Sequence, residues 1–187
     1  LGSILENLGK LEDAEVSTRK AIQLNPNFAN AHSNLGNILK ELGKLQDAEF
    51  SYRNAIKIKP DYSEAYSNLG TILRDFGKLK EAEICYKKAI ALEPNHAIIN
   101  ANLGGILYEI SKLEDAELYT RKAIKLNPNF ALAHLNLGNI LRAHGKLEDA
   151  ELSTRKAIQL NPNFALAHFN LGNILKELGK LQDAEFS

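Results

Sequence analysis

A chain of 187 residues with 23 basic and 23 acidic side chains carries no formal net charge at pH 7. Binding to nucleic acid or to an anionic membrane usually requires a basic excess, so the composition argues against both functions. The single cysteine, Cys85, excludes an intrachain disulfide and favours a reducing, cytoplasmic location. No apolar run approaches the roughly 18 residues of a membrane span, and no signal-peptide pattern opens the chain.

The strongest pattern in the sequence is a repeat with a period of 34 residues. All five prolines follow it, at Pro26, Pro60, Pro94, Pro128 and Pro162. Leu-Gly pairs and two alanine columns keep the same step along the chain. Several columns in one register predict a tandem array of similar structural units.

Each unit is predicted to form two helices, and the first complete unit is representative. In Phe28–Leu42 the apolar residues recur at intervals of three and four, which is the spacing of one helical face. Gly43-Lys44 interrupts this pattern, as glycine does at a helix C-terminus, and a second apolar stripe runs through Leu45–Ile58. No segment alternates like a strand, so the sequence predicts an all-α class. The expected caps of the first helices are the residues after the prolines, Asn27, Asp61, Asn95, Asn129 and Asn163.

The small residues of the repeat indicate how the helices pack. Gly36 and Ala48 are expected at a close approach between the two helices of a hairpin. A single hairpin cannot bury its apolar faces, so stability must come from stacked neighbours in a solenoid. We expect one array, with a partial repeat at 1–28, full repeats at 29–62, 63–96, 97–130 and 131–164, and a partial repeat at 165–187.

The Leu-Gly, alanine and proline columns resemble the tetratricopeptide repeat (TPR), a family of 34-residue helical hairpins. The resemblance covers the whole chain, and it implies a right-handed superhelical solenoid of antiparallel helix-turn-helix hairpins. The recurring Asn-Leu-Gly motif is similar to that of bacterial TPR arrays and of the superhelical arm of O-linked N-acetylglucosamine transferases. The chain departs from the family in the usual Trp column, which here is His32, Tyr66, Asn100, His134 and His168.

In the TPR family the first helices line a concave groove, and two asparagine columns fall on these helices. An Asn amide can pair with an extended peptide backbone, and each such bond contributes roughly 0.5–1.5 kcal/mol. The resemblance to the glycosyltransferase arms implies an asparagine ladder for peptide binding. The alternative is that the first column caps or braces the neighbouring hairpin. The candidates are Asn34, Asn68, Asn102, Asn136 and Asn170 in the first column, and Asn37, Asn139 and Asn173 in the second.

An internal duplication points to the same groove. Residues 1–51 match residues 137–187 at 44 of 51 positions, and five of the seven differences fall on first helices at positions expected to face solvent. Free drift of exposed positions is the alternative explanation. Side-chain selectivity is expected from an exposed apolar patch of Leu132, Leu135, Leu166 and Phe169. A basic row of Lys40, Arg74, Arg142 and Lys176 is expected beside it, unless these residues form salt bridges with neighbouring acids.

The chain shows no pattern typical of an active site, so we predict that it is not an enzyme and needs no cofactor or metal. His32, His134 and His168 lie one per hairpin, too far apart to share a metal, and we interpret them as half-buried replacements for the family's aromatic residue. Cys85 has no histidine partner suggested by the sequence. Phosphate-binding, nucleophile-elbow and zinc-site motifs are missing.

The sequence therefore predicts a scaffold that binds an extended peptide or partner segment in the concave groove. The expected partner is a protein or peptide, with no nucleic acid and no membrane. The alternative is a substrate-recruiting arm of a larger enzyme, for example a glycosyltransferase, whose catalytic domain lies outside this chain. RNA binding by a related helical-repeat code would need 35-residue units and a basic face. Because neither end has a polar capping helix, we also expect that the ends can associate with one another.

Overall fold

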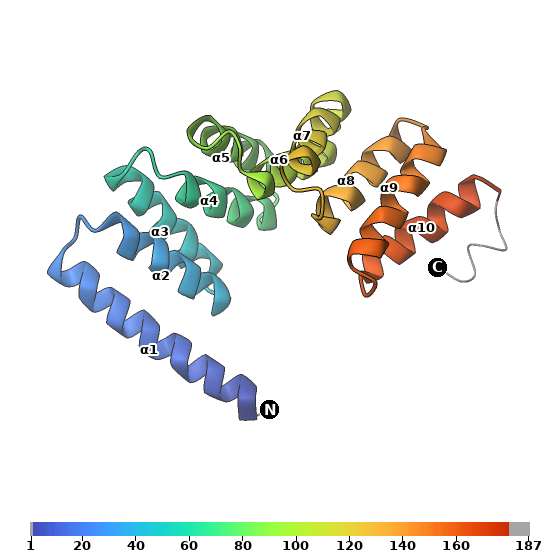
Figure 1. Ribbon diagram of the computed structural model, residues 1–187. Helices are drawn as coiled ribbons and strands as arrows, with labels where there is room; N and C mark the ends of the chain where they lie inside the picture. Colours follow the sequence, from blue (N-terminus) through green and yellow to red (C-terminus); the bar gives the residue numbers. More distant parts are fainter. Residues whose placement is uncertain (1, 180–187) are drawn as a thin grey trace. The chain divides into compact units, whose positions relative to one another are not determined.

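The structure is a computed structural model that describes residues 2–179, and their regular secondary structure is entirely α-helical (Figure 1). The all-α prediction is confirmed for this part of the chain. The helices are α1 (Gly2–Leu24), α2 (Ala29–Glu41), α3 (Leu45–Ile58), α4 (Ser63–Asp75), α5 (Leu79–Leu92), α6 (Ala97–Glu109), α7 (Leu113–Leu126), α8 (Ala131–Ala143), α9 (Leu147–Leu160) and α10 (Ala165–Glu177).

Helices α2 to α9 form four antiparallel hairpins, in which each even-numbered helix packs on the next odd-numbered one. The turn of the first hairpin shows how the sequence stops the helix. Gly43 has a φ of 73°, and the amide of Lys44 donates back to the carbonyl of Leu39 at 2.8 Å. Glycine reaches this left-handed conformation without the steric cost of a Cβ, so it ends the helix and starts the return. The predicted break at Gly43-Lys44 is confirmed.

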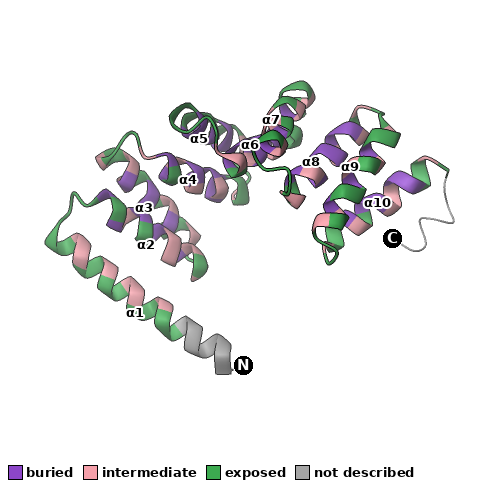
Figure 2. Ribbon diagram, in the orientation of Figure 1, coloured by how far each residue is buried: buried purple, intermediate pink, exposed green. Residues whose placement is uncertain are grey.

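The close approach predicted at Gly36 is also observed. A Cβ placed on Gly36 would lie 2.6 Å from Cε1 of Tyr52, which is buried in the facing helix. Ala48 and Ala55 are fully buried. Figure 2 shows the buried residues along the facing sides of the helices, with exposed residues on the outside. The small columns therefore set how near the helices of a hairpin can come.

The chain divides into two compact units, residues 1–94 and 95–187. In the first unit the core contains the large buried side chains Leu39, Tyr52, Leu73 and Tyr86. In the second unit the core comprises chiefly aliphatic residues from α6, α8 and α10, and polar Thr120 and Thr154 replace the two tyrosines of the first unit. Each unit is a stack of hairpins with its own core.

Helix α1 differs from the regular hairpins. By the register of the repeat, a turn would fall at Gly9-Lys10, but α1 is continuous from Gly2 to Leu24. The first helices α2, α4, α6 and α8 begin at residues 29, 63, 97 and 131.

The predicted caps of the first helices are wrong by one residue. The N-cap positions of α2, α4, α8 and α10 are aromatic and make no side-chain cap hydrogen bond. At α6 the cap is His96, whose Nδ1 accepts from the amide of Ile99 at 3.5 Å. Asn127 lies before the proline and accepts from the amide of Asn129 at 3.1 Å, so it orders the turn between hairpins. An asparagine side chain satisfies such local donors as well in a turn as at a helix end.

Candidate binding surfaces

The helices of each unit present two different surfaces. The first-helix face is the surface formed by α2 and α4 in the first unit, and by α6, α8 and α10 in the second. The second-helix face is formed by α1, α3 and α5 in the first unit, and by α7 and α9 in the second. The sequence predicted a binding site on the first-helix face.

The first-helix face of the second unit contains an open pocket of about 400 Å³. Tyr108 from α6, Asn139, Arg142 and Ala143 from α8, and Glu177 from α10 line it. Two of these residues, Asn139 and Arg142, are candidates from the sequence. The spacing of three between them places both on one side of α8. Tyr108 and Glu177 were not predicted as site residues. Tyr108 shares the column of the basic row, and Glu177 is one of the acidic residues next to that row.

The charges in this pocket are paired. The guanidinium of Arg142 donates to the carboxylate of Glu177 on the next first helix. This hydrogen bond raises the pKa of Arg142 and lowers the pKa of Glu177. Arg142 therefore forms a salt bridge with a neighbouring acid, which was the alternative to a free basic row. Of the other residues in the basic row, Arg74 and Lys176 are exposed and Lys40 is half-buried.

The asparagine columns connect neighbouring hairpins. In the first unit Asn68 Nδ2 donates to Asn37 Oδ1 at 3.0 Å, and Tyr52 Oη donates to the same oxygen at 2.7 Å. In the second unit Asn170 Nδ2 donates to Asn139 Oδ1 at 2.7 Å, and Asn136 Nδ2 donates to the carbonyl of Ala101 at 3.3 Å.

These bonds are the bracing that was considered as the alternative to a peptide ladder. Each donating amide uses one of its two hydrogens in these bonds, so the other could still donate to a peptide carbonyl. The structure places Asn34 in an exposed position, and Asn102 and Asn173 in half-buried ones. A role of these columns in peptide binding stays a prediction.

The predicted apolar patch is only partly exposed, and the prediction for Leu135 is wrong. Leu132 is 37% exposed and Leu166 is 52% exposed, whereas Leu135 is 1% exposed. Leu135 packs with Ala157 and Ala167 under the following hairpin. Its column faces the next first helix instead of solvent, and the matching residues Ser33, Ser67 and Ala101 are buried too. Phe169 shares this column and is exposed because no further described helix covers α10.

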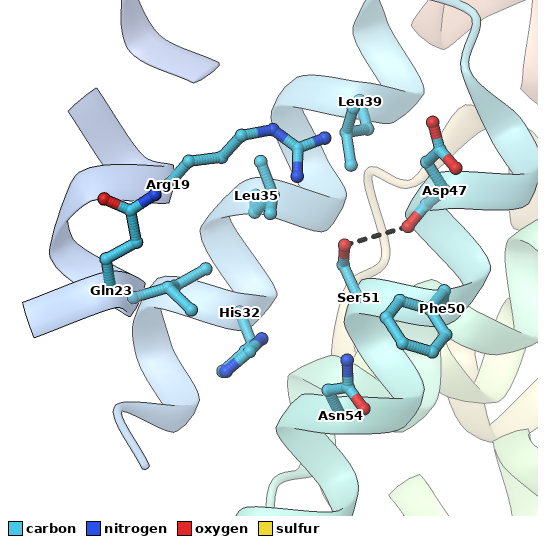
Figure 3. A pocket seen from close by; sticks show the side chains of 10 residues that line it. Arg19, Gln23, His32, Leu35, Leu39, Asp47, Phe50, Ser51 and Asn54 are labelled. Carbon is cyan, nitrogen blue, oxygen red and sulfur yellow. Dashed lines mark hydrogen bonds between the residues drawn. The ribbon is translucent and has the colours of Figure 1, made fainter. Parts of the chain in front are cut away.

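A groove that the sequence analysis did not anticipate lies on the second-helix face of the first unit (Figure 3). It has a volume of about 280 Å³ between α1 and α3, and α2 forms its floor. Figure 3 shows His32, Leu35 and Leu39 on the floor and Phe50 at the side. The hydroxyl of Ser51 donates to the carbonyl of Asp47 at 2.8 Å within the wall. Arg19, Ile22, Gln23 and Asn54 complete the lining.

The second unit has a matching groove of about 440 Å³ between α7 and α9. Its floor contains His134 and Leu137 from α8, at the positions that His32 and Leu35 occupy in the first unit. Phe50 in the first groove and Leu152 in the second belong to one column of exposed apolar residues on the second helices. It comprises Val16, Phe50, Ile84, Leu118 and Leu152, which are 61–69% exposed. The 34-residue repeat contains this signal, because each member lies two residues after one of the recurring alanines Ala14, Ala48, Ala82, Ala116 and Ala150.

The three repeated histidines are half-buried, as predicted. Nε2 of His32, His134 and His168 lies 2.9–3.0 Å from the carbonyl oxygen of the proline six residues earlier. A carbonyl can only accept, so Nε2 carries the proton and donates. Each histidine thereby ties its first helix to the turn that precedes it.

The remaining reactive groups do not assemble into a site. Cys85 is 8% exposed, and burial raises the pKa of its thiol to about 11, so it stays protonated at neutral pH. Among the described residues no group of three His, Cys, Asp or Glu side chains is placed to hold a metal ion. Across the same residues, no helix combines the length and apolar character that crossing a membrane requires.

Comparison with protein-family models identifies the chain as a member of the tetratricopeptide repeat family. Models described as TPR repeat or tetratricopeptide repeat match residues 2–43, 29–62, 63–96, 97–130, 119–151 and 138–179. Together these matches extend from residue 2 to residue 179. The chain therefore belongs to the TPR family, as its repeat columns predicted. No curated protein sequence matches it.

Solved TPR structures share the fold. One described as PilW, a widely conserved type IV pilus biogenesis factor, is 26% identical with a TM-score of 0.84, over 94% of this chain and 81% of that chain. PilF of Pseudomonas aeruginosa is 23% identical with a TM-score of 0.82, over 97% and 82%. YrrB, described as a TPR protein with an unusual peptide-binding site, is 24% identical with a TM-score of 0.74, over 89% and 86%. At these identities the likeness to PilF and YrrB concerns the fold alone.

Proposed function

We propose that this protein is a protein-interaction scaffold, and that the first-helix face of its second unit binds an extended segment of a partner protein. The observation that carries the proposal is the open pocket lined by Tyr108, Asn139 and Arg142. Its lining is mostly polar, and the amide of Asn139 and the guanidinium of Arg142 are donors that can pair with the backbone of an extended segment.

The residues around the pocket support this function. Ile98, Leu132 and Leu166 occupy one column at the start of α6, α8 and α10, and all three are exposed. On α8, Leu132 lies on the same helical side as Asn139, seven residues later. An extended peptide could place apolar side chains against this column and its backbone against the asparagines and Arg142. The solved structure of YrrB shows that a TPR protein of similar fold has a peptide-binding site.

The proposal can be tested by selecting peptides from a random library displayed on phage and measuring their affinity by fluorescence anisotropy. Replacing Leu132 and Leu166 with Asp removes the exposed apolar column. We expect binding of the selected peptides to fall more than about tenfold, since central apolar anchors dominate such interfaces. Helical content should be unchanged because both side chains are exposed.

The matched control is Leu152→Asp, which places the same charge at an exposed leucine of the second-helix face. Peptides that bind the first-helix face should retain their affinity for this variant. If the selected peptides bind the Leu132→Asp, Leu166→Asp protein as well as the wild type, the first-helix face is not the peptide site.

A further inference from the structure

The second-helix grooves are not explained by a site on the first-helix face. The groove between α7 and α9 has an apolar floor and wall, formed by Ile124, Leu137 and the exposed Leu152. Soluble proteins leave few such apolar hollows next to exposed leucines, and these tend to mark partner surfaces. The hollow is open on the protein surface, and it shares only α8, and no lining residue, with the pocket at Arg142.

The depth of this groove comes from a small floor residue. His134 lies where Tyr66 lies two repeats earlier, between α3 and α5. There Tyr66 is half-buried, and an ion pair from Arg53 to Glu81 at 3.2 Å spans the two second helices. Between α7 and α9 the imidazole of His134 is smaller than a phenol, and it is directed to the carbonyl of Pro128.

The charges of the groove distinguish it from its counterpart in the first unit. Arg121, Lys125 and Lys156 line the groove between α7 and α9, and no carboxylate lines it. Arg121 is paired with Glu117 at 2.8 Å, and Lys156 donates to the neutral amide of Gln159 at 2.9 Å. The two lysines take part in no ion pair within the described residues. The uncompensated positive charge of the rim therefore comes from Lys125 and Lys156.

The first-unit groove has the same architecture without this charge. Gln23 and Asn54 lie where Lys125 and Lys156 lie in the second unit, and Asp47 is also among the lining residues. Of the acidic residues on α7 and α9, Glu117 is paired with Arg121, and Asp149 is exposed outside the lining. The two grooves are thus a matched pair that differs mainly in rim charge.

We propose that the groove between α7 and α9 is a second docking site, and that it binds an acidic amphipathic segment of a partner protein. Apolar side chains of that segment lie over Leu152 and Leu137, and its carboxylates lie at Lys125 and Lys156. The apolar wall favours a peptide over nucleic acid, whose phosphates would gain nothing from Leu152. This site is separate from the proposed first-helix site, so each can be tested without the other.

The test uses a fluorescein-labelled peptide of about four helical turns, built from Glu, Leu and Ala with the leucines on one side. Two controls replace every Glu with Gln or with Lys. The acidic peptide should bind the full chain more tightly than the Gln peptide, and the Lys peptide should not bind. Raising the salt concentration should weaken binding of the acidic peptide, since the rim charges are exposed.

Two variants locate the site. The double variant Lys125→Gln with Lys156→Asn gives the groove the residues of its first-unit counterpart, and it should weaken acidic-peptide binding about three- to tenfold at low salt. His134→Tyr gives the floor the residue found at position 66, and it should abolish binding by filling the groove. Both variants should retain the far-ultraviolet circular dichroism of the wild type.

A further set of substitutions gives the first-unit groove the rim charge of the second-unit groove. Gln23→Lys with Asn54→Lys and Asp47→Ala should add a second binding site of similar affinity, measured as a change in stoichiometry by titration calorimetry. Leu132→Asp with Leu166→Asp should leave acidic-peptide binding unchanged, which separates this site from the first-helix face. Equal affinity of the wild type and the Lys125→Gln, Lys156→Asn protein would overturn the proposal, and so would tighter binding of a single-stranded RNA oligonucleotide than of the acidic peptide.

Discussion

The two units use the same hairpin to present different surfaces. On the first helices of the first unit the exposed column is polar, with Asn30 and Glu64, whereas in the second unit it is apolar, with Ile98, Leu132 and Leu166. The column that packs between hairpins changes in parallel, from Ser33 and Ser67 to Ala101 and Leu135. The repeat therefore keeps the small residues at which the two helices of a hairpin meet, and it varies the residues between hairpins and at the surface. The two units can thus present different surfaces to partners.

The packing column gives the strongest test of this difference. Leu135→Ser places in the second unit the residue that the first unit has at Ser33. We expect the free energy of unfolding to fall by about 3–5 kcal/mol, because the change leaves a cavity beside Ala157 and Ala167 and buries a hydroxyl. Hydrogen exchange should show reduced protection of the amides of α8 and α9, while those of α2 and α3 keep theirs. Equal loss in both units would mean that they do not unfold independently.

A substitution in a turn of the second unit should have a smaller effect on stability, and it should stabilise the protein. Ser111 has a φ of 60°, where the other hairpin turns have glycines with φ of 70–76°. A residue with a Cβ is strained in this region, so Ser111→Gly should stabilise the protein by about 0.5–1 kcal/mol. Gly145→Ser is the reverse change in the next hairpin and should destabilise by a similar amount. Thermal unfolding of the two variants measures both.

In the first unit, removing a buried hydroxyl should increase the stability of the protein. Ser33 is fully buried, and its Oγ has no hydrogen-bond partner among the described residues. Ser33→Ala should therefore stabilise the protein by up to about 1 kcal/mol in urea unfolding, since an unpaired hydroxyl is removed. Ala101, fully buried at the matching position, shows that the column accepts alanine. A loss of stability would indicate that the hydroxyl does have a partner.

The smallest effect concerns a ladder of ion pairs on the second helices, in which Glu15, Glu49 and Glu117 each pair with an arginine four residues later and a lysine of the next hairpin. Hydrogen bonds from Arg121 lower the pKa of Glu117 below 4.5. Its contribution is therefore complete above pH 4.5 and is lost as the pH falls through the lowered folded-state value.

Glu117→Gln should cost about 0.2–1 kcal/mol at pH 7, and the difference from the wild type should vanish in acid. Glu49→Gln is the matched change in the first unit. Urea unfolding at pH 7 and pH 3 checks both, and a cost at pH 7 that persists unchanged at pH 3 would contradict the ion-pair explanation.

The fold was predictable because it depends on residues that recur. The close-approach glycine Gly36 recurs in the four complete hairpins, and the turn glycine Gly43 recurs in three of them, with Ser111 in the fourth. Periodicity alone therefore revealed the turn and the close approach. Leu135 was misplaced because helical periodicity cannot distinguish a side facing solvent from a side facing the next hairpin. The groove at His134 was missed for another reason: its depth depends on the volume of a floor residue relative to two flanking helices, which only coordinates show.

The bond from each repeated histidine to the proline carbonyl has a consequence for the order in which a hairpin can form. The donor and the acceptor are six residues apart in His32, His134 and His168, so each bond closes a short loop within one segment of the chain. Such a bond does not need a neighbouring hairpin to be in place. Each turn can therefore be fixed to its own first helix before the hairpins stack.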